Sequence, residues 1–275
     1  MKVAVVGAGS VGARHIRNLV ALGVPAEDIT AMDFRTDALD ALPFGVAKVC
    51  CQPTDLLAET IGRPDALLIC TPATHHQTFI SHAQRSGIPF FVEKPAALST
   101  ETIFHWDYSG RHLVACNWRF RPEARRLYEA MRAVDDHYRI ELVSMGDIRA
   151  WPGQRYASPI FEFCHEIDLA LWVAPNLRWH RAEVWPDSAR IEFIEARGGG
   201  SVAIAWRHRW FRSWSLSDAD GTVFCDPPDD LNRMYVDEMA HFLRVVRGEE
   251  ESVNTLAQAR RVVEVCELVE RTAVQ

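Results

Sequence analysis

The chain has 275 residues, which corresponds to roughly two domains at about 150 residues per domain. Hydrophobic residues make up 48% and charged residues 24% of the composition, which is typical of a folded globular protein and excludes disordered, collagen-like and coiled-coil chains. Thirty lysines and arginines against 37 aspartates and glutamates give a net charge of −7 without a basic block, which argues against nucleic acid as the partner.

The apolar runs are no longer than a strand, so we expect no transmembrane helix and no membrane partner. No signal peptide is visible, because only four apolar residues separate Lys2 from Gly7. The seven cysteines are an odd number without a Cys-x-x-Cys pair, which indicates thiols in a reducing compartment, and we expect a cytoplasmic protein. The histidines lack matching cysteines or carboxylates, so we expect no metal site.

The first 117 residues are predicted to alternate strands with helices. The predicted strands are Lys2–Val6, Ile29–Asp33, Ala66–Cys70, Pro89–Glu93 and His112–Asn117. Helices are predicted at Val11–Leu22 and Thr78–Ser86, the second of them ending at Gly87. This alternation predicts βαβ units and a parallel sheet, so we expect an α/β domain over residues 1–117.

The pattern changes at Trp118, where a second domain covering residues 118–275 is predicted to begin. The predicted strands are Tyr138–Ala150, Arg178–Trp185, Arg190–Arg197, Ser201–Trp210 and Trp214–Ala219. The predicted helices are Pro122–Val134, Cys164–Val173, Val236–Val246 and Thr255–Arg271. Gly198-Gly199-Gly200 is interpreted as a hairpin turn. We expect an α+β domain with a large open mixed or antiparallel sheet, whose last helices could pack back on the first domain.

Gly7-Ala8-Gly9-Ser10-Val11-Gly12 is a GxGxxG sequence between the first predicted strand and helix, and this position favours a Rossmann dinucleotide site over another glycine-rich turn. Gly7 would permit the tight turn, Gly9 the approach of the pyrophosphate and Gly12 the close packing of helix on strand. The start of the helix at Ser10 and Val11 would offer N–H groups to phosphate.

Asp33 ends the second predicted strand, 21 residues after Gly12. A carboxylate there accepts the ribose hydroxyls of NAD and repels a 2′-phosphate. Arg35 could hold that phosphate instead, so NAD(H) is favoured and NADP(H) stays open.

Lys94 is one of only three lysines among the 30 basic residues, the others being Lys2 and Lys48. A lysine differs from an arginine in being able to give up a proton. Lys94 is therefore a candidate for proton transfer, although three lysines must fall somewhere by chance.

Glu93-Lys94-Pro95 and Thr71-Pro72 each follow an apolar strand, and with the glycine fingerprint they resemble the Gfo/Idh/MocA family (glucose–fructose oxidoreductase, inositol dehydrogenase, rhizopine catabolism). The resemblance continues through the chain in three further segments: Asn117–Pro122, His165-Glu166-Ile167-Asp168 and Tyr235–Met239 with Phe242.

The resemblance implies an NAD(P)-dependent oxidoreductase that moves a hydride between nicotinamide and a hydroxyl or ketone of a sugar, cyclitol or sugar derivative. Lys94 would hydrogen-bond the reacting oxygen and relay its proton, and His165 would be the general acid–base. An imidazole suits that task near neutral pH. The resemblance also adds four residues to the implied cofactor contacts besides Lys94: Thr71, Pro72, His76 and Glu93.

The chain departs from the family pattern before His165, where the position that often holds an aspartate is Phe161. Glu162 could supply that carboxylate, although its longer side chain changes the geometry. Asp168, three residues after His165, would support the site by orienting His165 or would pair within the fold. The connection between Lys94 and Asn117 and the loop Trp151–Pro159 are short compared with the family.

Trp118, Arg119, Arg121 and Arg155 are candidate substrate contacts besides Lys94 and His165. Guanidinium groups suit a carbohydrate-like substrate that carries a carboxylate or phosphate, although each could be an ordinary surface charge.

The second-domain strands are rich in tryptophan: Trp179, Trp185, Trp206, Trp210 and Trp214. Exposed on the sheet, these rings would form the surface through which the family pairs subunits, giving a homodimer or homotetramer. The alternative is burial under the closing helices.

Two other functions stay open at this point. One is an NAD-dependent glycoside hydrolase of the same family, and the other is a non-catalytic dinucleotide-sensing regulatory protein.

Overall fold

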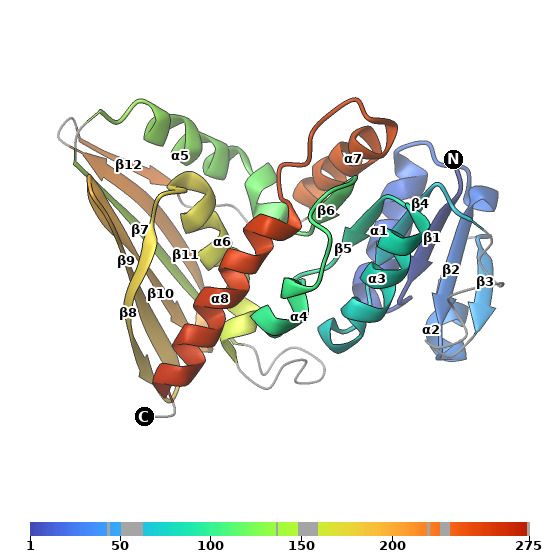
Figure 1. Cartoon of the computed structure of the whole chain (residues 1–275), viewed down its shortest axis with the longest axis horizontal. Helices are drawn as coiled ribbons and strands as arrows, with labels where there is room; N and C mark the ends of the chain where they lie inside the picture. The colour runs from blue at the N-terminus through green and yellow to red at the C-terminus, as the bar shows by residue number, and fades with distance from the viewer. Residues whose placement is uncertain are drawn as a thin grey trace. The chain divides into compact units, whose positions relative to one another are not determined.

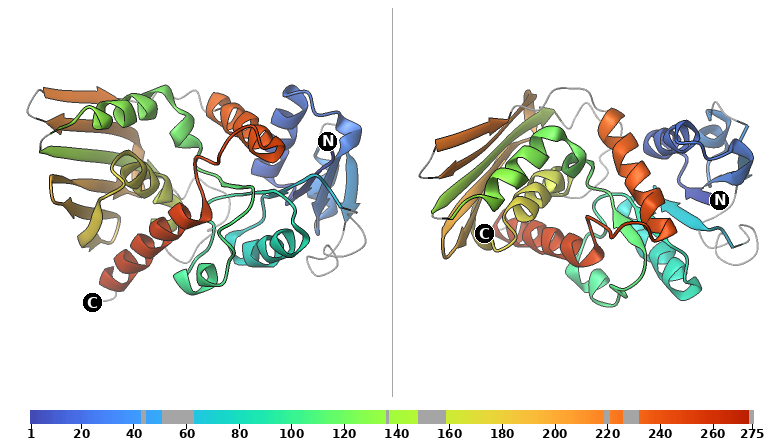
Figure 2. Two further views of the ribbon diagram at one scale, coloured as in Figure 1. Left: turned by 45° about the horizontal axis from the view of Figure 1, so that its top comes forward. Right: turned by 90° about the horizontal axis from the view of Figure 1, so that it is seen from above.

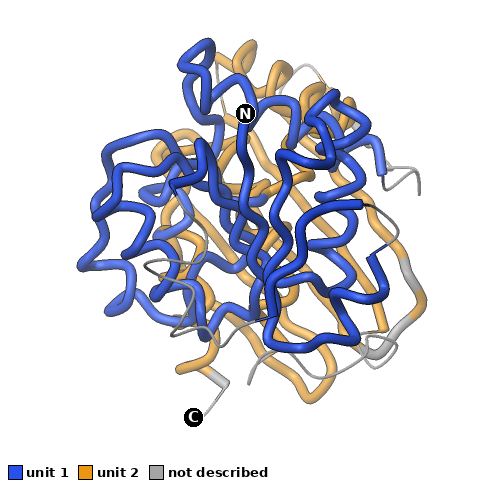
Figure 3. The backbone as a smooth tube through the Cα atoms, turned by 90° about the vertical axis from the view of Figure 1, so that its right-hand side faces the viewer, with its two compact units in different colours: residues 1–115, 231–260 blue, residues 116–230, 261–275 orange. Residues whose placement is uncertain are grey.

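The computed structural model of the chain describes residues 1–42, 45–50, 63–135, 137–147, 159–218, 221–225 and 232–273. The chain divides into two compact units, one formed by Met1–Ala115 with Leu231–Arg260 and the other by Cys116–Asp230 with Arg261–Gln275 (Figure 3). The first unit is therefore built from two stretches of sequence. Its first stretch ends two residues before the expected boundary at residue 117.

The first unit contains a six-stranded sheet in the order β3-β2-β1-β4-β5-β6, in which every pairing is parallel (Figure 1). Its strands are β1 (Val3–Val6), β2 (Ile29–Asp33), β3 (Ala47–Cys50), β4 (Ala66–Ile69), β5 (Phe90–Val92) and β6 (His112–Val114). β1 and β4 are buried throughout, as their unbroken apolar sequences require. The strands β2 and β3 lie on one side of β1, and β4, which comes next in the chain, lies on the other side. The carboxyl end of β1 is therefore a topological switch point.

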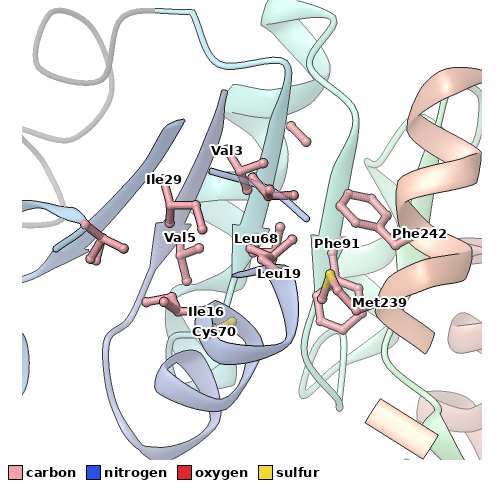
Figure 4. Packing of buried hydrophobic residues seen from close by; sticks show 14 of the residues in the cluster. Val3, Val5, Ile16, Leu19, Ile29, Leu68, Cys70, Phe91, Met239 and Phe242 are labelled. Atoms are coloured by element: carbon pink, nitrogen blue, oxygen red, sulfur yellow. The ribbon is translucent and has the colours of Figure 1, made fainter. Parts of the chain in front are cut away.

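Each helix of the first unit buries part of its surface inside the unit. These helices are α1 (Ser10–Ala21), α2 (Thr36–Asp40), α3 (His76–Ser86), α4 (Thr100–Phe104) and α7 (Asn232–Arg247). Met239 and Phe242 of α7 join a core that includes Leu19, Leu68 and Phe91 (Figure 4). The rings of Phe91 and Phe242 meet edge to face, with centroids 5.7 Å apart. A helix from late in the sequence thus completes the first core.

The second unit contains a six-stranded mixed sheet in the order β12-β11-β7-β10-β9-β8. Its strands are β7 (Tyr138–Asp147), β8 (Arg178–Trp185), β9 (Ser188–Glu195), β10 (Gly198–Ala205), β11 (Arg207–Asp218) and β12 (Gly221–Cys225). Only β7 and β10 pair in parallel. The helices α5 (Pro122–Arg132) and α6 (Cys164–Val173) contact one face of this sheet (Figure 2). The predicted α/β fold with a mixed second sheet is confirmed.

The last helix, α8 (Leu256–Ala273), begins in the first unit and continues in the second. The single-turn segments include η3 (Ala73–His75) in the first unit and η4 (Asn117–Phe120) and η6 (Pro159–Phe163) in the second. Among the described residues, no helix combines the length and the apolar character needed to cross a bilayer.

The glycine triplet was predicted wrongly. Gly198, Gly199 and Gly200 begin β10 and do not form the turn, which lies one step earlier at 196–197. A Cβ on Gly198 would overlap the carbonyl oxygen of Tyr138, and one on Gly199 would lie 2.6 Å from that of Phe193. The glycines are present because neighbouring strands approach closely on both sides.

Candidate functional site

The glycine turn joins β1 to α1 with the geometry that a dinucleotide site needs. Gly7 has φ +92°, and its N–H donates to the carbonyl of Met32 at 2.8 Å. A Cβ on Gly12 would overlap the carbonyl oxygen of Gly7, so only glycine lets α1 start so close to β1. A Cβ on Gly9 would meet nothing within 4 Å, so this side of the turn is open.

The N-cap residue of α1 is Gly9, which has no side chain to cap the first turn. Ser10 and Val11 begin the helix directly after the open side of the turn, and their N–H groups are of the kind that bind phosphate.

Asp33 is buried at the carboxyl end of β2, beside the glycine turn. Its Oδ2 accepts the N–H of Ala8 at 2.7 Å, and its Oδ1 accepts the N–H of Arg35 at 2.9 Å. A carboxylate has about four lone-pair positions, so both oxygens can accept further hydrogen bonds. The Arg35 side chain is half exposed, and its Nε lies 4.0 Å from Asp37.

His76 links the segments that follow β4 and β5. Its Nε2 lies 2.8 Å from the carbonyl oxygen of Thr71, and its Nδ1 lies 3.1 Å from that of Pro95 and 3.2 Å from that of Ala96. Burial lowers the pKa of His76, although the hydrogen bonds to these carbonyls oppose the shift. His76 therefore holds the Thr71-Pro72 segment in place from inside the fold.

Glu93 and Lys94 leave β5 at the same edge of the sheet as the glycine turn, because all its strands run parallel. The Oε1 of Glu93 lies 2.8 Å from His15 Nε2 on α1, and its Oε2 accepts the backbone N–H of Lys94 at 3.2 Å. Both carboxylate oxygens of Glu93 thus have hydrogen-bond partners within the protein, and the adjacent Lys94 is partly buried. The Lys94–Pro95 peptide is cis. His15 was missed in the sequence, where a histidine three residues after Gly12 was the available signal.

Arg119 and Asp168 form a buried bidentate ion pair in the second unit. Arg119 Nε donates to Asp168 Oδ2 at 2.8 Å, a second bond joins Nη2 to Oδ1, and both side chains are 2% exposed. Burial opposes the charge of Arg119, but Asp168 outweighs it and raises the pKa of the guanidinium. The Arg119 guanidinium is therefore engaged within the fold, and its expected substrate contact stays a prediction. For Asp168, the ion pair favours a role in pairing within the fold over a role in orienting His165.

His165 on α6 is partly exposed, and its ring stacks on Trp118 with centroids 5.3 Å apart and planes 13° apart. The Arg212 guanidinium lies 4.9 Å from the Trp118 ring centroid, and the Trp214 ring lies 5.1 Å away. Trp118 is therefore a buried support for His165. Arg212, which the sequence analysis did not select, belongs to the same stack.

The remaining candidates differ in their surroundings. Arg121 is buried, and Glu162 is partly exposed on η6. Phe161 is buried, so the position that often carries an aspartate faces the core. Arg155 lies outside the described residues.

The tryptophan-rich strands are only partly exposed. Trp206 and Trp214 are buried, which contradicts an interface role for these two rings, whereas Trp185 is exposed. Trp214 lies on β11, and Trp206 lies between β10 and β11. Both occupy inward-facing positions of the second sheet, which fill the core.

Residues 1–107 match the model of a family described as an oxidoreductase family with an NAD-binding Rossmann fold. An inositol 2-dehydrogenase of Cereibacter sphaeroides strain ATCC 17023 is 28% identical over 208 residues, which cover 69% of this chain and 59% of that protein. The chain thus spans about three-fifths of the length of that curated relative.

Two solved structures share the fold over nearly the whole chain. A myo-inositol dehydrogenase from Corynebacterium glutamicum ATCC 13032 has a TM-score of 0.83 and 18% identity, covering 99% of this chain and 97% of that one. A myo-inositol dehydrogenase from Lactobacillus casei, in complex with NAD(H) and myo-inositol, has a TM-score of 0.83 and 16% identity, covering 100% and 95%. At these identities the likeness establishes the fold.

Proposed function

We propose that this chain, whose first 107 residues match the model of an oxidoreductase family with an NAD-binding Rossmann fold, is an NAD(H)-dependent oxidoreductase acting on a CH–OH group of a cyclitol or sugar. The observation that carries the proposal is the shared edge of the first sheet. There the open glycine turn, the Asp33 carboxylate and Lys94 all lie at carboxyl ends of parallel strands. Ligands of doubly wound sheets bind at this edge.

The residues present fit a dinucleotide. The open side of Gly9 and the uncapped start of α1 would receive the pyrophosphate, and Asp33 would accept the ribose hydroxyls. The charge of Asp33 beside the turn disfavours a 2′-phosphate, which supports NAD(H) over NADP(H). When bound, the nicotinamide supplies the hydride acceptor or donor.

Lys94 and His165 would handle the proton. Oxidation of a carbinol removes a proton from oxygen, and reduction of a ketone returns it. The Lys94 ammonium would hydrogen-bond the reacting oxygen and stabilise its negative charge. The His165 imidazole, whose ring plane is held by Trp118, would take up or release the proton. The relatives named above are dehydrogenases, which favours this function over a glycoside hydrolase or a regulatory protein.

We assign a polyol substrate without a required negative charge. The resemblance to inositol dehydrogenases supports a cyclitol or sugar. The expectation of an anionic group rested partly on Arg119, whose guanidinium is bound to Asp168.

The protein would work in a reducing compartment, the cytoplasm. Cys70 and Cys266 are buried thiols, and burial raises the pKa of each well above its ordinary value, so both are unreactive.

Subunit pairing through the second sheet forms the last part of the proposal. Alternate residues of β7 are buried on the inner face, while Arg139, Glu141 and Val143 point to the outer face. Trp185, Ile194 and Phe211 lie on that outer face and are 45%, 49% and 51% exposed. The same face carries charges of alternating sign, such as Arg181 and Glu192, 2.8 Å apart. A second copy of the chain would cover the apolar residues and complement the charges.

The proposal is tested by replacing Lys94 with alanine. We expect Lys94→Ala to lower kcat for NAD-dependent oxidation of myo-inositol, scyllo-inositol or glucose by about 10²- to 10⁴-fold, the usual contribution of proton transfer. The Kd for NADH, measured by energy transfer from tryptophan, should change only a few-fold.

Lys48→Ala is the matched control, because Lys48 is an exposed lysine on β3 of the same unit. It should behave as the unmodified protein in both measurements. Undiminished turnover in Lys94→Ala would remove the proposed role of Lys94, and failure to bind NADH or NADPH would overturn the oxidoreductase function itself.

A further inference from the structure

His15 is a buried histidine at the centre of the first unit. It lies on α1, three residues after the last glycine of the turn, and its side chain is 0% exposed. The Phe91 ring of β5 meets it edge-on at 4.9 Å, and the Tyr235 ring of α7 does so at 5.9 Å. Three elements therefore fix the position of the imidazole.

The orientation of His15 serves one hydrogen bond, from Nε2 to the Oε1 of Glu93 at 2.8 Å. Burial opposes the ionisation of Glu93, but the hydrogen bond from His15 and the nearby Lys94 outweigh it, so the pKa of Glu93 lies below its ordinary value. An ionised carboxylate only accepts hydrogen bonds, so Nε2 is the donor.

The second oxygen of Glu93 accepts the backbone N–H of Lys94 at 3.2 Å. One carboxylate thus joins α1, the helix of the glycine turn, to the residue proposed to hold the proton. The same carboxylate also interacts with the Lys94 ammonium, whose positive charge lowers the pKa of Glu93.

We propose that His15 is a positioning residue that keeps Glu93 ionised and oriented, and through Glu93 sets the position and charge of Lys94. The inference rests on the proposed function for the role of Lys94 in the reaction. It assigns Glu93 a task inside the protein in place of the cofactor contact expected from the sequence.

Other titratable groups lie near His15 and Glu93. Around His15 they are Tyr235 and Arg14, whose guanidinium lies 4.5 Å from the Tyr235 ring centroid. Around Glu93 they are Lys94 together with His76 and Cys70, whose pKa values respond to the Glu93 charge. Glu238 adds a second carboxylate near Cys70. Among the residues that the structure describes, His15 is the side chain that donates to Oε1 of Glu93.

The scarcity of lysine gives a direct readout without cofactor or substrate. Reductive methylation with ¹³C-formaldehyde keeps the charge of lysine and labels three side chains, Lys2, Lys48 and Lys94, and the N-terminus. The Lys94 signal is identified by its loss in Lys94→Arg. As pH is lowered, this signal should show an inflection when Glu93 takes up a proton.

We expect the midpoint of that inflection to lie below about 4.3, the ordinary value for glutamate. In His15→Leu, which has no donor, it should rise by roughly one unit or more, because burial of Glu93 is then opposed by Lys94 without the hydrogen bond from His15. In His15→Gln, whose amide keeps an N–H donor, it should stay within half that shift. In Glu93→Gln the inflection should disappear.

His241→Leu is the matched control, because His241 and Glu250 form a second His–Glu pair in the same unit, with Nδ1 and Oε2 2.6 Å apart. It should lower the melting temperature without moving the Lys94 signal. If His15→Leu also lowers only the melting temperature, His15 is merely structural and the inference is wrong. An inflection that persists in Glu93→Gln also overturns it.

A kinetic measurement adds the functional consequence. In His15→Leu, kcat/KM should gain an acidic limb at higher pH than in the unmodified protein, with KM for NADH changed less than kcat. The labelling result does not depend on turnover, so a failure of the proposed oxidoreductase function is distinguished from a failure of the His15–Glu93–Lys94 coupling.

Discussion

Asp33 combines two tasks in one carboxylate. It accepts the N–H groups of Ala8 and Arg35, which fixes the end of β2 against the glycine turn. The same charge stands where the ribose of a dinucleotide would lie, and it is therefore both a structural acceptor and the proposed selector of NAD(H).

Replacing Asp33 with asparagine should relax this selection. The variant keeps an acceptor oxygen but loses the charge that repels a 2′-phosphate, so the ratio of NADPH to NADH affinity should rise about tenfold, or ~1.4 kcal/mol. Energy transfer from tryptophan to each reduced cofactor measures both Kd values.

Arg35 provides the control for that experiment. If its guanidinium holds the phosphate in Asp33→Asn, adding Arg35→Ala should remove the gain. An unmodified protein that already binds NADPH as tightly as NADH would contradict the selecting role of Asp33.

Site residues that belong to a short sequence motif could be predicted from the sequence. Residues whose role depends on a partner far away in the sequence could not. Gly7, Gly9 and Gly12 follow one strand at fixed spacing, and the positive φ of Gly7 and the close backbone approach at Gly12 match the turn and the packing predicted for them. Arg119 has no such signature, since its partner Asp168 lies 49 residues away. His15 meets Glu93 across 78 residues, so only the folded sheet shows that the two side chains touch.

At the scale of elements, the contact between α1 and β1 depends on Gly12, and the space outside the turn depends on Gly9. These two requirements can be separated experimentally, because a Cβ on Gly12 would overlap backbone and a Cβ on Gly9 would meet nothing within 4 Å.

Gly12→Ala should destabilise the protein by about 1–3 kcal/mol or more, as overpacking of a close backbone contact does. Gly9→Ala should unfold at the same denaturant concentration as the unmodified protein, since its φ of −64° suits alanine. It should nevertheless bind NADH at least tenfold more weakly, because the added methyl occupies the approach to the pyrophosphate. Urea unfolding and NADH titration of both variants check this, and normal NADH binding by Gly9→Ala would contradict the assignment.

The bounds of helices and strands were predicted best in segments whose hydrophobic residues recur with a single period. Ile29–Asp33, Cys164–Val173 and Arg178–Trp185 have the predicted bounds. β3 was missed because its residues are largely exposed and show little apolar pattern. β10 was shortened at its start because glycine usually marks a turn, whereas here it permits close strand pairing.

At the scale of the whole molecule, we propose that copies of the chain associate through the outer face of the second sheet. Phe211→Glu or Ile194→Glu should shift the protein towards monomer, because a buried unpaired charge opposes association. Light scattering coupled to gel filtration measures the mass.

Val223→Glu is the control for this prediction. Val223 is 38% exposed but pairs with Leu216, whose side chain is buried on the inner face of the sheet. It should leave the mass unchanged. An unmodified protein that runs as a monomer at concentrations of ~50 μM would contradict pairing through this face.

Because α7 belongs to the first unit, the core of that unit is completed late in synthesis. Residues up to Ala115 leave the ribosome well before α7, whose Met239 and Phe242 complete the first core. At ~5–20 residues per second, the roughly 130 residues between Ala115 and the end of α7 take about 7 to 26 seconds to synthesise. During that interval the surface around Phe91 is without its covering helix, so the nascent chain presents an apolar patch that a ribosome-associated chaperone would bind. The emergence of α7 from the ribosome then sets the time at which the first core closes.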